Sequence, residues 1–111
     1  MPECQILTLV VPVDVKDDVV DTLIEMEGIT GFNLEKIAGF SKEHSRFNLR
    51  EQVGGYRELY RFEVIHSKKQ QPLLLSALRP VCDAPRIRYW ITPILEQGHF
   101  GEAAQAPSAN D

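Results

Sequence analysis

The spacing of apolar residues alternates between strand and helix periods, and the order of these patterns limits the fold more than any other feature. The run QILTLVV at 5–11 is apolar and β-branched, which predicts a strand that is central in its sheet. Further strands are predicted at 32–42, 59–66 and 87–95. We expect a bulge or bend in the strand at 32–42, because its apolar phase shifts at Ile37.

Two helices are predicted between these strands. The first covers about Val15–Glu27, where apolar residues recur four positions apart, with Asp14 as a candidate N-cap and Gly28 as the stop. The second begins at Ser67 and ends near Pro80, since proline interrupts the hydrogen bonds of a helix. The chain therefore has the order strand, helix, strand, strand, helix, strand.

This order in 111 residues predicts one α+β domain with the ferredoxin-like βαββαβ arrangement, a four-stranded antiparallel sheet with two helices on one face. We assign the domain to residues 1–98, with a long loop at about 43–57 and a flexible tail at 99–111. Pro93 cannot donate to a ladder, so it lies at a sheet edge or strand end. Both faces of the sheet carry apolar residues, namely Leu7, Leu9 and Val10 on the first strand and Tyr89, Trp90 and Ile91 on the last. We therefore expect a second copy to cover the helix-free face.

Composition excludes several classes of function. A net charge of −4 gives no basic face for nucleic acid, and no apolar run is long enough for direct membrane insertion. The N-terminus lacks the pattern of a signal peptide, which favours a cytoplasmic protein. Cys4 and Cys82 stand far apart in sequence and match neither a zinc ribbon nor a disulfide framework. The sequence carries no catalytic motif, so we do not expect an enzyme.

Two motifs carry a family resemblance. KDDV at 16–19 and GITGFNLEKIAGF at 28–40 lie on the first predicted helix and the second strand. This stretch resembles the PII signalling proteins, and within that superfamily an uncharacterised PII-like group that is sometimes encoded beside heavy-metal efflux pumps. The resemblance implies a homotrimeric regulatory protein with ligand clefts between neighbouring subunits and a long loop that contacts a partner protein.

The resemblance also implies a ligand site at the base of the long loop and at the connection before the last strand. The residues at these positions, as candidates for binding a nucleotide, another small anion or a divalent metal, are Gly39, Ser41, Lys42, Glu43, Arg86 and Arg88. Ser41 stands where other members have glycine, and Glu43 where they have a glutamine. The connection at 82–86 lacks the family's glycine-rich run. The identity of the ligand therefore stays open.

The loop region is basic, whereas the first predicted helix is acidic. Residues 41–61 contain five Lys or Arg and three Asp or Glu. Arg46, Arg50 and Arg57 are candidates for docking on an acidic surface of a partner such as a transporter or enzyme. The alternative is a solvated loop whose charge is incidental.

The histidines suggest metal binding as an alternative function. His44, next to Glu43, is the candidate metal ligand, and His66 at a strand end is expected to be structural. Because a trimer can gather ligands from several chains, the alternative function is a metal-binding or metal-tolerance module resembling the trimeric divalent-cation tolerance proteins. A third possibility is an interaction subunit that binds no ligand.

Overall fold

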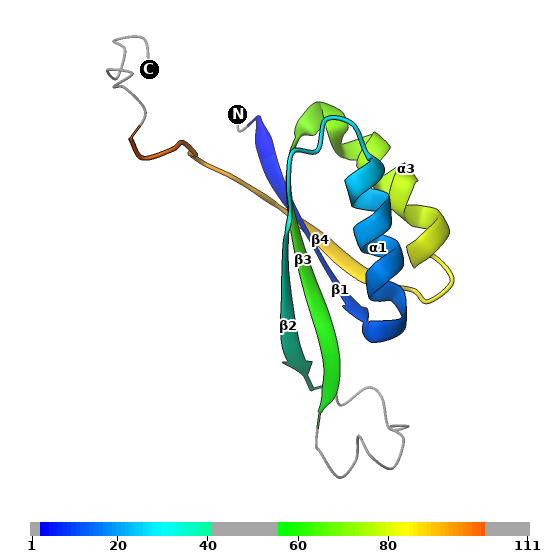
Figure 1. The fold of residues 1–111 in the computed structure, drawn as a ribbon. Helices are drawn as coiled ribbons and strands as arrows, with labels where there is room; N and C mark the ends of the chain where they lie inside the picture. Colours follow the sequence, from blue (N-terminus) through cyan, green and yellow to red (C-terminus); the bar gives the residue numbers. More distant parts are fainter. Residues whose placement is uncertain (1–2, 41–55, 102–111) are drawn as a thin grey trace.

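The computed structural model describes residues 3–40 and 56–101 and has the ferredoxin-like architecture that the sequence predicts (Figure 1). Within these residues an antiparallel sheet of four strands, in the order β2-β3-β1-β4, carries both helices on one face. Along the chain the elements are β1 (Cys4–Pro12), α1 (Val13–Glu25), β2 (Asn33–Gly39), β3 (Arg57–Ser67), the 3₁₀ turn η1 (Lys68–Gln70), α3 (Gln71–Cys82) and β4 (Arg88–Pro93). The prediction that the first strand is central is confirmed.

The hydrophobic core lies between the sheet and the two helices. Every second residue of β1 points to the helices, because side chains alternate across a strand. The buried apolar side chains of this layer are Leu7, Leu9, Val11, Val15, Val19, Leu23, Phe62, Val64, Leu74 and Leu78. Leu7 and Leu9 thus belong to the helix side of the sheet, whereas Val10 and Trp90 lie on the helix-free face.

The helix-free face is partly exposed in a single copy. It carries Thr8, which is buried, but also Ile65 and Trp90, which are 49% and 42% exposed. Charged side chains separate these apolar residues. This face is therefore amphipathic rather than a second core.

The first helix starts and ends earlier than expected. It begins at Val13, so that Asp14 lies in its first turn instead of capping it, and Pro12 takes the N-cap position. Proline fits this place because its fixed φ suits a helix entry and it has no N–H to satisfy. The helix ends at Glu25 rather than Glu27, and Gly28 follows in the connection with φ +89°.

The second helix begins where predicted but does not end at Pro80. Ser67 and Gln70 form a reciprocal capping box, with Gln70 N donating to Ser67 Oγ at 3.2 Å and Ser67 N donating to Gln70 Oε1 at 2.8 Å. The helix α3 continues through Pro80 to Cys82. The packing of Leu78 and Cys82 on the core outweighs the one backbone hydrogen bond that Pro80 removes.

The structure differs from two further expectations, which concern a bulge in β2 and the start of β3. Pairing of β2 with β3 is unbroken from Asn33–Glu63 to Gly39–Arg57, so β2 has no bulge over these residues. The strand β3 begins at Arg57, which places this residue in the sheet and not in the loop. The prediction for Pro93 is confirmed, since it ends the edge strand β4. Residues 41–55 and 102–111, which hold most of the predicted loop and tail, lie outside the described residues.

No helix in the part of the chain that the structure describes is long and apolar enough to span a membrane.

Candidate ligand-binding site

The ends of the predicted loop are held together by the last pairs of β2 and β3. Gly39 pairs with Arg57, and beyond this pair the rings of Phe40 and Tyr56 lie 5.9 Å apart. Phe40 and Tyr56, the described residues next to this segment, therefore lie side by side.

An ion pair lies nearby on the same two strands. Lys36 Nζ is 3.2 Å from Glu58 Oε1, and the hydrogen bond and charge of Glu58 raise the pKa of Lys36. The loop base is thus fixed by backbone pairing, an aromatic contact and an exposed ion pair.

The side chain of Leu59 occupies the space beside Gly39. A Cβ atom here would overlap Leu59 Cδ1 and lie 3.2 Å from Leu59 Cγ. A larger residue at position 39 would therefore require the Leu59 side chain to change its conformation.

The turn between α3 and β4 is closed by a series of backbone hydrogen bonds. Asp83 N donates to Arg79 O at 2.9 Å, Arg86 N to Asp83 O at 2.9 Å, and Ile87 N to Cys82 O at 3.1 Å. Arg86 has φ +56°, a left-handed conformation that favours glycine. This turn sets the backbone positions of Arg86 and of Arg88, the first residue of β4.

One row across the helix-free face of the sheet contains two arginines and one glutamate. The register aligns Glu35, Arg61, Val10 and Arg88 on successive strands. Arg61 Nη2 donates to Glu35 Oε1, while the guanidinium of Arg88 lies 5.8 Å from the ring centroid of Trp90. Guanidinium groups bind carboxylates and phosphates through paired hydrogen bonds, so Arg88 is suited to an anion.

The loop base and the arginine turn share one end of the sheet but lie at opposite edges. Gly39 ends β2 and Arg88 begins β4, and β3 and β1 run between these two edge strands. Three interstrand spacings, about 14 Å, separate the two strands, and Gly39 also lies four residues, about 13 Å, beyond the row that contains Glu35 and Arg88. One copy therefore does not bring Gly39 and Arg88 into a single site.

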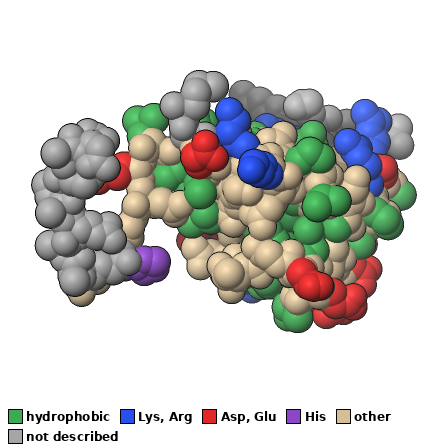
Figure 2. Space-filling model, turned by 90° about the horizontal axis from the view of Figure 1, so that it is seen from above, with side chains coloured by type: hydrophobic (Ala, Val, Ile, Leu, Met, Phe, Trp, Pro, Cys, Tyr) green, Lys and Arg blue, Asp and Glu red, His purple; other side chains and the backbone are tan. Residues whose placement is uncertain are grey.

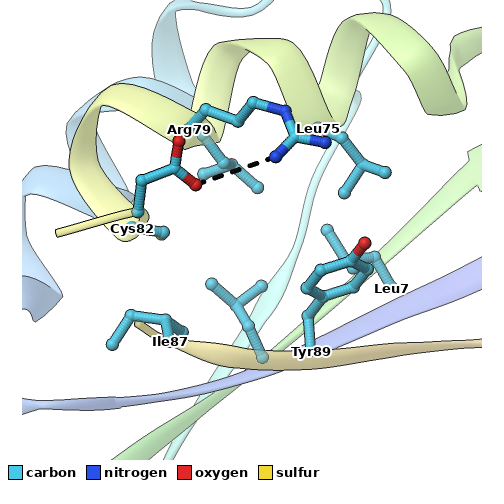
Figure 3. Close-up of a pocket in the computed structure, with 9 residues that line it drawn as sticks. Leu7, Leu75, Arg79, Cys82, Ile87 and Tyr89 are labelled. Carbon is cyan, nitrogen blue, oxygen red and sulfur yellow. Dashed lines mark ion pairs between the residues drawn. The ribbon is translucent and has the colours of Figure 1, made fainter. Parts of the chain in front are cut away.

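A cleft opens between α3 and β4 on the helix side of the sheet (Figure 3). Its free volume is about 60 Å³. Arg79 and Asp83 form an ion pair at 3.7 Å above it, and burial, with a smaller contribution from Asp83, raises the pKa of the Cys82 thiol. The residues of this α3–β4 cleft are Leu7, Leu9, Leu75, Leu78, Arg79, Cys82, Asp83, Ile87 and Tyr89.

The described histidines and cysteines do not form a metal site. Residues 3–40 and 56–101 contain no group of three or more His, Cys, Asp or Glu that could hold a metal ion. His66 is 2% exposed, and its Nδ1 lies 3.1 Å from Val64 O, which agrees with a structural role. The proposed ligand His44 lies outside the described residues.

The structure thus places some of the predicted site residues and leaves others open. The described candidates are Gly39 on β2, Arg57 on β3, Arg86 in the turn after α3 and Arg88 on β4. The remaining candidates lie outside the described residues: Ser41, Lys42, Glu43, His44, Arg46 and Arg50.

Sequence reasoning missed the α3–β4 cleft and the pairing of Arg61 with Glu35. The spacing of Arg79 and Asp83, four residues apart on a helix, was a usable signal for part of the cleft. No local signal connects Glu35 with Arg61, which is 26 positions away, because only the strand register brings them together.

Comparisons with known proteins identify relatives of uncharacterised function. A family model described as "Protein of unknown function (DUF3240)" matches residues 1–101. A solved DUF3240 family protein from Shewanella baltica OS155 is 45% identical, with a TM-score of 0.74 over 89% of this chain and 98% of that chain. The comparison with curated proteins gave no match.

A second similar structure is a Bacillus cereus protein related to NIF3, with a TM-score of 0.64 and 15% identity. The match covers 88% of this chain but 27% of the other, so it shows a shared fold with part of a larger protein.

Proposed function

This chain belongs to the DUF3240 family, and from that premise we propose that it is a PII-like regulatory protein. In this proposal it forms a homotrimer, binds a small anionic ligand or a metal ion, and controls a partner such as a transporter or enzyme through the segment between β2 and β3. The support comes from the KDDV and GITGFNLEKIAGF motifs together with the ferredoxin-like fold. The proposed role is regulatory and not catalytic.

The observation that carries the proposal is the placement of the candidate residues at one end of the sheet but on opposite edges. In a ring of copies, a surface on one copy meets a different surface on the next. Such a ring would join the loop base at Gly39 of one copy to Arg86 and Arg88 of its neighbour. The ligand site would then be shared between subunits.

The chemistry of these groups favours an anion. Arg88 is held at the start of β4 beside Trp90, and Arg86 comes from a turn fixed by backbone hydrogen bonds. A preorganised guanidinium loses little freedom when it binds a phosphate or carboxylate. In this proposal, Ser41, Lys42 and Glu43 form the other side of the same site. The residues that contact the partner protein are Arg46, Arg50 and Arg57.

Calorimetric titration of the full chain with ATP, ADP and AMP tests this proposal. We expect one of these nucleotides to bind, and Arg88→Ala to weaken binding by about tenfold or more, as loss of a charge-assisted contact does. Lys69→Ala is the matched control, because exposed Lys69 lies beyond the far end of β3. Equal affinities in Arg88→Ala and the wild type would remove Arg88 from the site.

The same titration with zinc and copper separates the metal-binding alternative. If the chain binds a metal and no nucleotide, and His44→Ala abolishes the binding, the metal-tolerance reading replaces the anion site. Metal affinity that is unchanged in His44→Ala would remove this ligand.

A further inference from the structure

The chain continues beyond β4 as an extended arm that leaves the body of the protein (Figure 1, orange). We define the C-terminal arm as residues 94–101. Its first residue is tied to the sheet, since Ile94 N donates to Cys4 O at 3.1 Å. Beyond that bond Leu95 and Phe100 are 90% and 108% exposed. Both of these large apolar side chains are therefore uncovered in a single copy.

The α3–β4 cleft has the complementary character. Its walls are mostly aliphatic, with Leu75 on one side and Ile87 and Tyr89 on the other (Figure 3). Tyr89 is 50% exposed, so the single copy leaves this wall half uncovered. The open side of the cleft therefore has room for the edge of an apolar side chain.

The cleft also has a charged rim that suits an acidic segment. Arg79 pairs with Asp83 at 3.7 Å, and both side chains are more than half exposed. This long, solvated contact leaves donors of Arg79 available for a second carboxylate. The C-terminal arm offers one, because Glu96 lies between Leu95 and Phe100.

The arm of a chain points away from its own cleft. The cleft lies at the start of β4, near Ile87 and Tyr89, whereas the arm departs from the other end of β4, beside Cys4. Eight extended residues span up to about 26 Å, enough to reach a neighbouring molecule. A second copy of this chain therefore supplies both a cleft for the arm and an arm for the cleft.

We propose that the C-terminal arm of one copy docks in the α3–β4 cleft of a second copy. The ring of Phe100 covers Tyr89 and Leu75 at the mouth of the cleft, and the carboxylate of Glu96 binds Arg79 at the rim. The cleft is then completed by a residue of the partner copy. This inference rests on the self-association contained in the proposed function, but it names a contact that trimer formation alone does not require.

Cross-linking through the native Cys82 tests the contact directly in the full chain. The variant Phe100→Cys in a Cys4→Ser background leaves Cys82 as the other thiol, and mild oxidation at slightly alkaline pH should link separate chains. Peptide mapping should locate the bond between positions 82 and 100, and adding Cys82→Ser should abolish it. Leu73→Cys in the same background is the control, because Leu73 is exposed on α3 outside the cleft and should not link to Cys82.

Light scattering of the unoxidised protein distinguishes a failure of the docked arm from a failure of the proposed assembly. An oligomer that gives no 82–100 link, or a link within one chain, overturns the docked arm but leaves the proposed assembly standing. A monomer overturns both. An oligomer with an intermolecular 82–100 link supports the arm, and Phe100→Ala should then make Cys82 react faster with an alkylating reagent.

Discussion

Gly28 and Arg86 both adopt left-handed backbone conformations, with φ of +89° and +56°, but only one of them is a glycine. Gly28 also accepts a hydrogen bond from Gln70 Nε2 at 2.7 Å, which joins the end of α1 to the start of α3. A side chain in this conformation costs about 1–2 kcal/mol. Arg86 bears that cost, and strained residues concentrate at functional sites, which supports a role for its side chain.

Replacement of Gly28 by alanine should destabilise the fold. A Cβ atom would meet Gln70 Nε2 at 2.7 Å and would also be strained by the positive φ. We expect Gly28→Ala to lower the free energy of unfolding by about 1–3 kcal/mol in urea titrations. Gly31→Ala is the control, since nothing lies within 4 Å of its Cβ position. Equal effects at both glycines would contradict the account.

Because the backbone of Arg86 is strained, replacing this residue with glycine should not lower the free energy of unfolding. Arg86→Gly should leave the free energy of unfolding unchanged or raise it by up to about 1 kcal/mol, because relief of strain outweighs the added chain entropy. The same variant should bind the anionic ligand more weakly. A clear loss of stability in urea unfolding would show that the Arg86 side chain holds the turn rather than a ligand.

The raised pKa of the Cys82 thiol predicts that the stability of the fold depends on pH. Burial raises its pKa in the folded protein, so the unfolded chain releases this proton more readily. The contribution of Cys82 to stability is therefore complete below the pKa of a free thiol and decreases as the pH rises past it. In urea titrations the wild type should lose stability relative to Cys82→Ala on going from neutral to alkaline pH. A difference that does not change with pH would contradict a buried, protonated thiol.

At the scale of elements, the apolar periods identified every strand and helix that the structure describes, but not their ends. Leu7 and Phe62 alternate with polar or half-exposed neighbours, which is a local property that the sequence displays. The ends depend on tertiary packing. Arg57 joins β3 because Gly39 is available as its pairing partner, and α3 passes Pro80 because Cys82 packs on the core.

Pro80 gives the clearest stability prediction for an element. It lies inside α3 and is exposed, so alanine there would restore an N–H without creating a cavity. We expect Pro80→Ala to raise the free energy of unfolding by about 1–2 kcal/mol, the helix gain less the lost rigidity of the unfolded chain. Pro72→Ala should bring no such gain in the same assay, because proline suits the first turn of a helix. A destabilised Pro80→Ala would mean that the turn after α3 depends on the proline.

The candidate site was less accessible to sequence reasoning than the fold. The motif around Gly39 pointed to the loop base, but the sequence could not show that Arg88 begins the opposite edge strand, because strand order is set by tertiary pairing. The α3–β4 cleft and the pair of Arg61 with Glu35 arise from contacts between distant segments. Such contacts leave no periodic signal in one sequence.

At the scale of the whole molecule, hydrophobic side chains remain exposed in several places, as the space-filling view illustrates for one side (Figure 2). Ile65 and Trp90 lie on the helix-free face, and Leu95 and Phe100 on the C-terminal arm. In the proposed assembly, the helix-free face and the C-terminal arm would both contact neighbouring copies.

Native mass spectrometry of the untagged protein tests the proposed ring of three copies that closes an anion site. This assembly should give a species of three 12.6 kDa chains that gains the mass of bound ATP, ADP or AMP. It also predicts that Ile65→Asp, on the helix-free face, dissociates this species, while Leu73→Asp, on the exposed side of α3, does not. A single chain that binds no nucleotide, in the wild type at the same concentration, would contradict it.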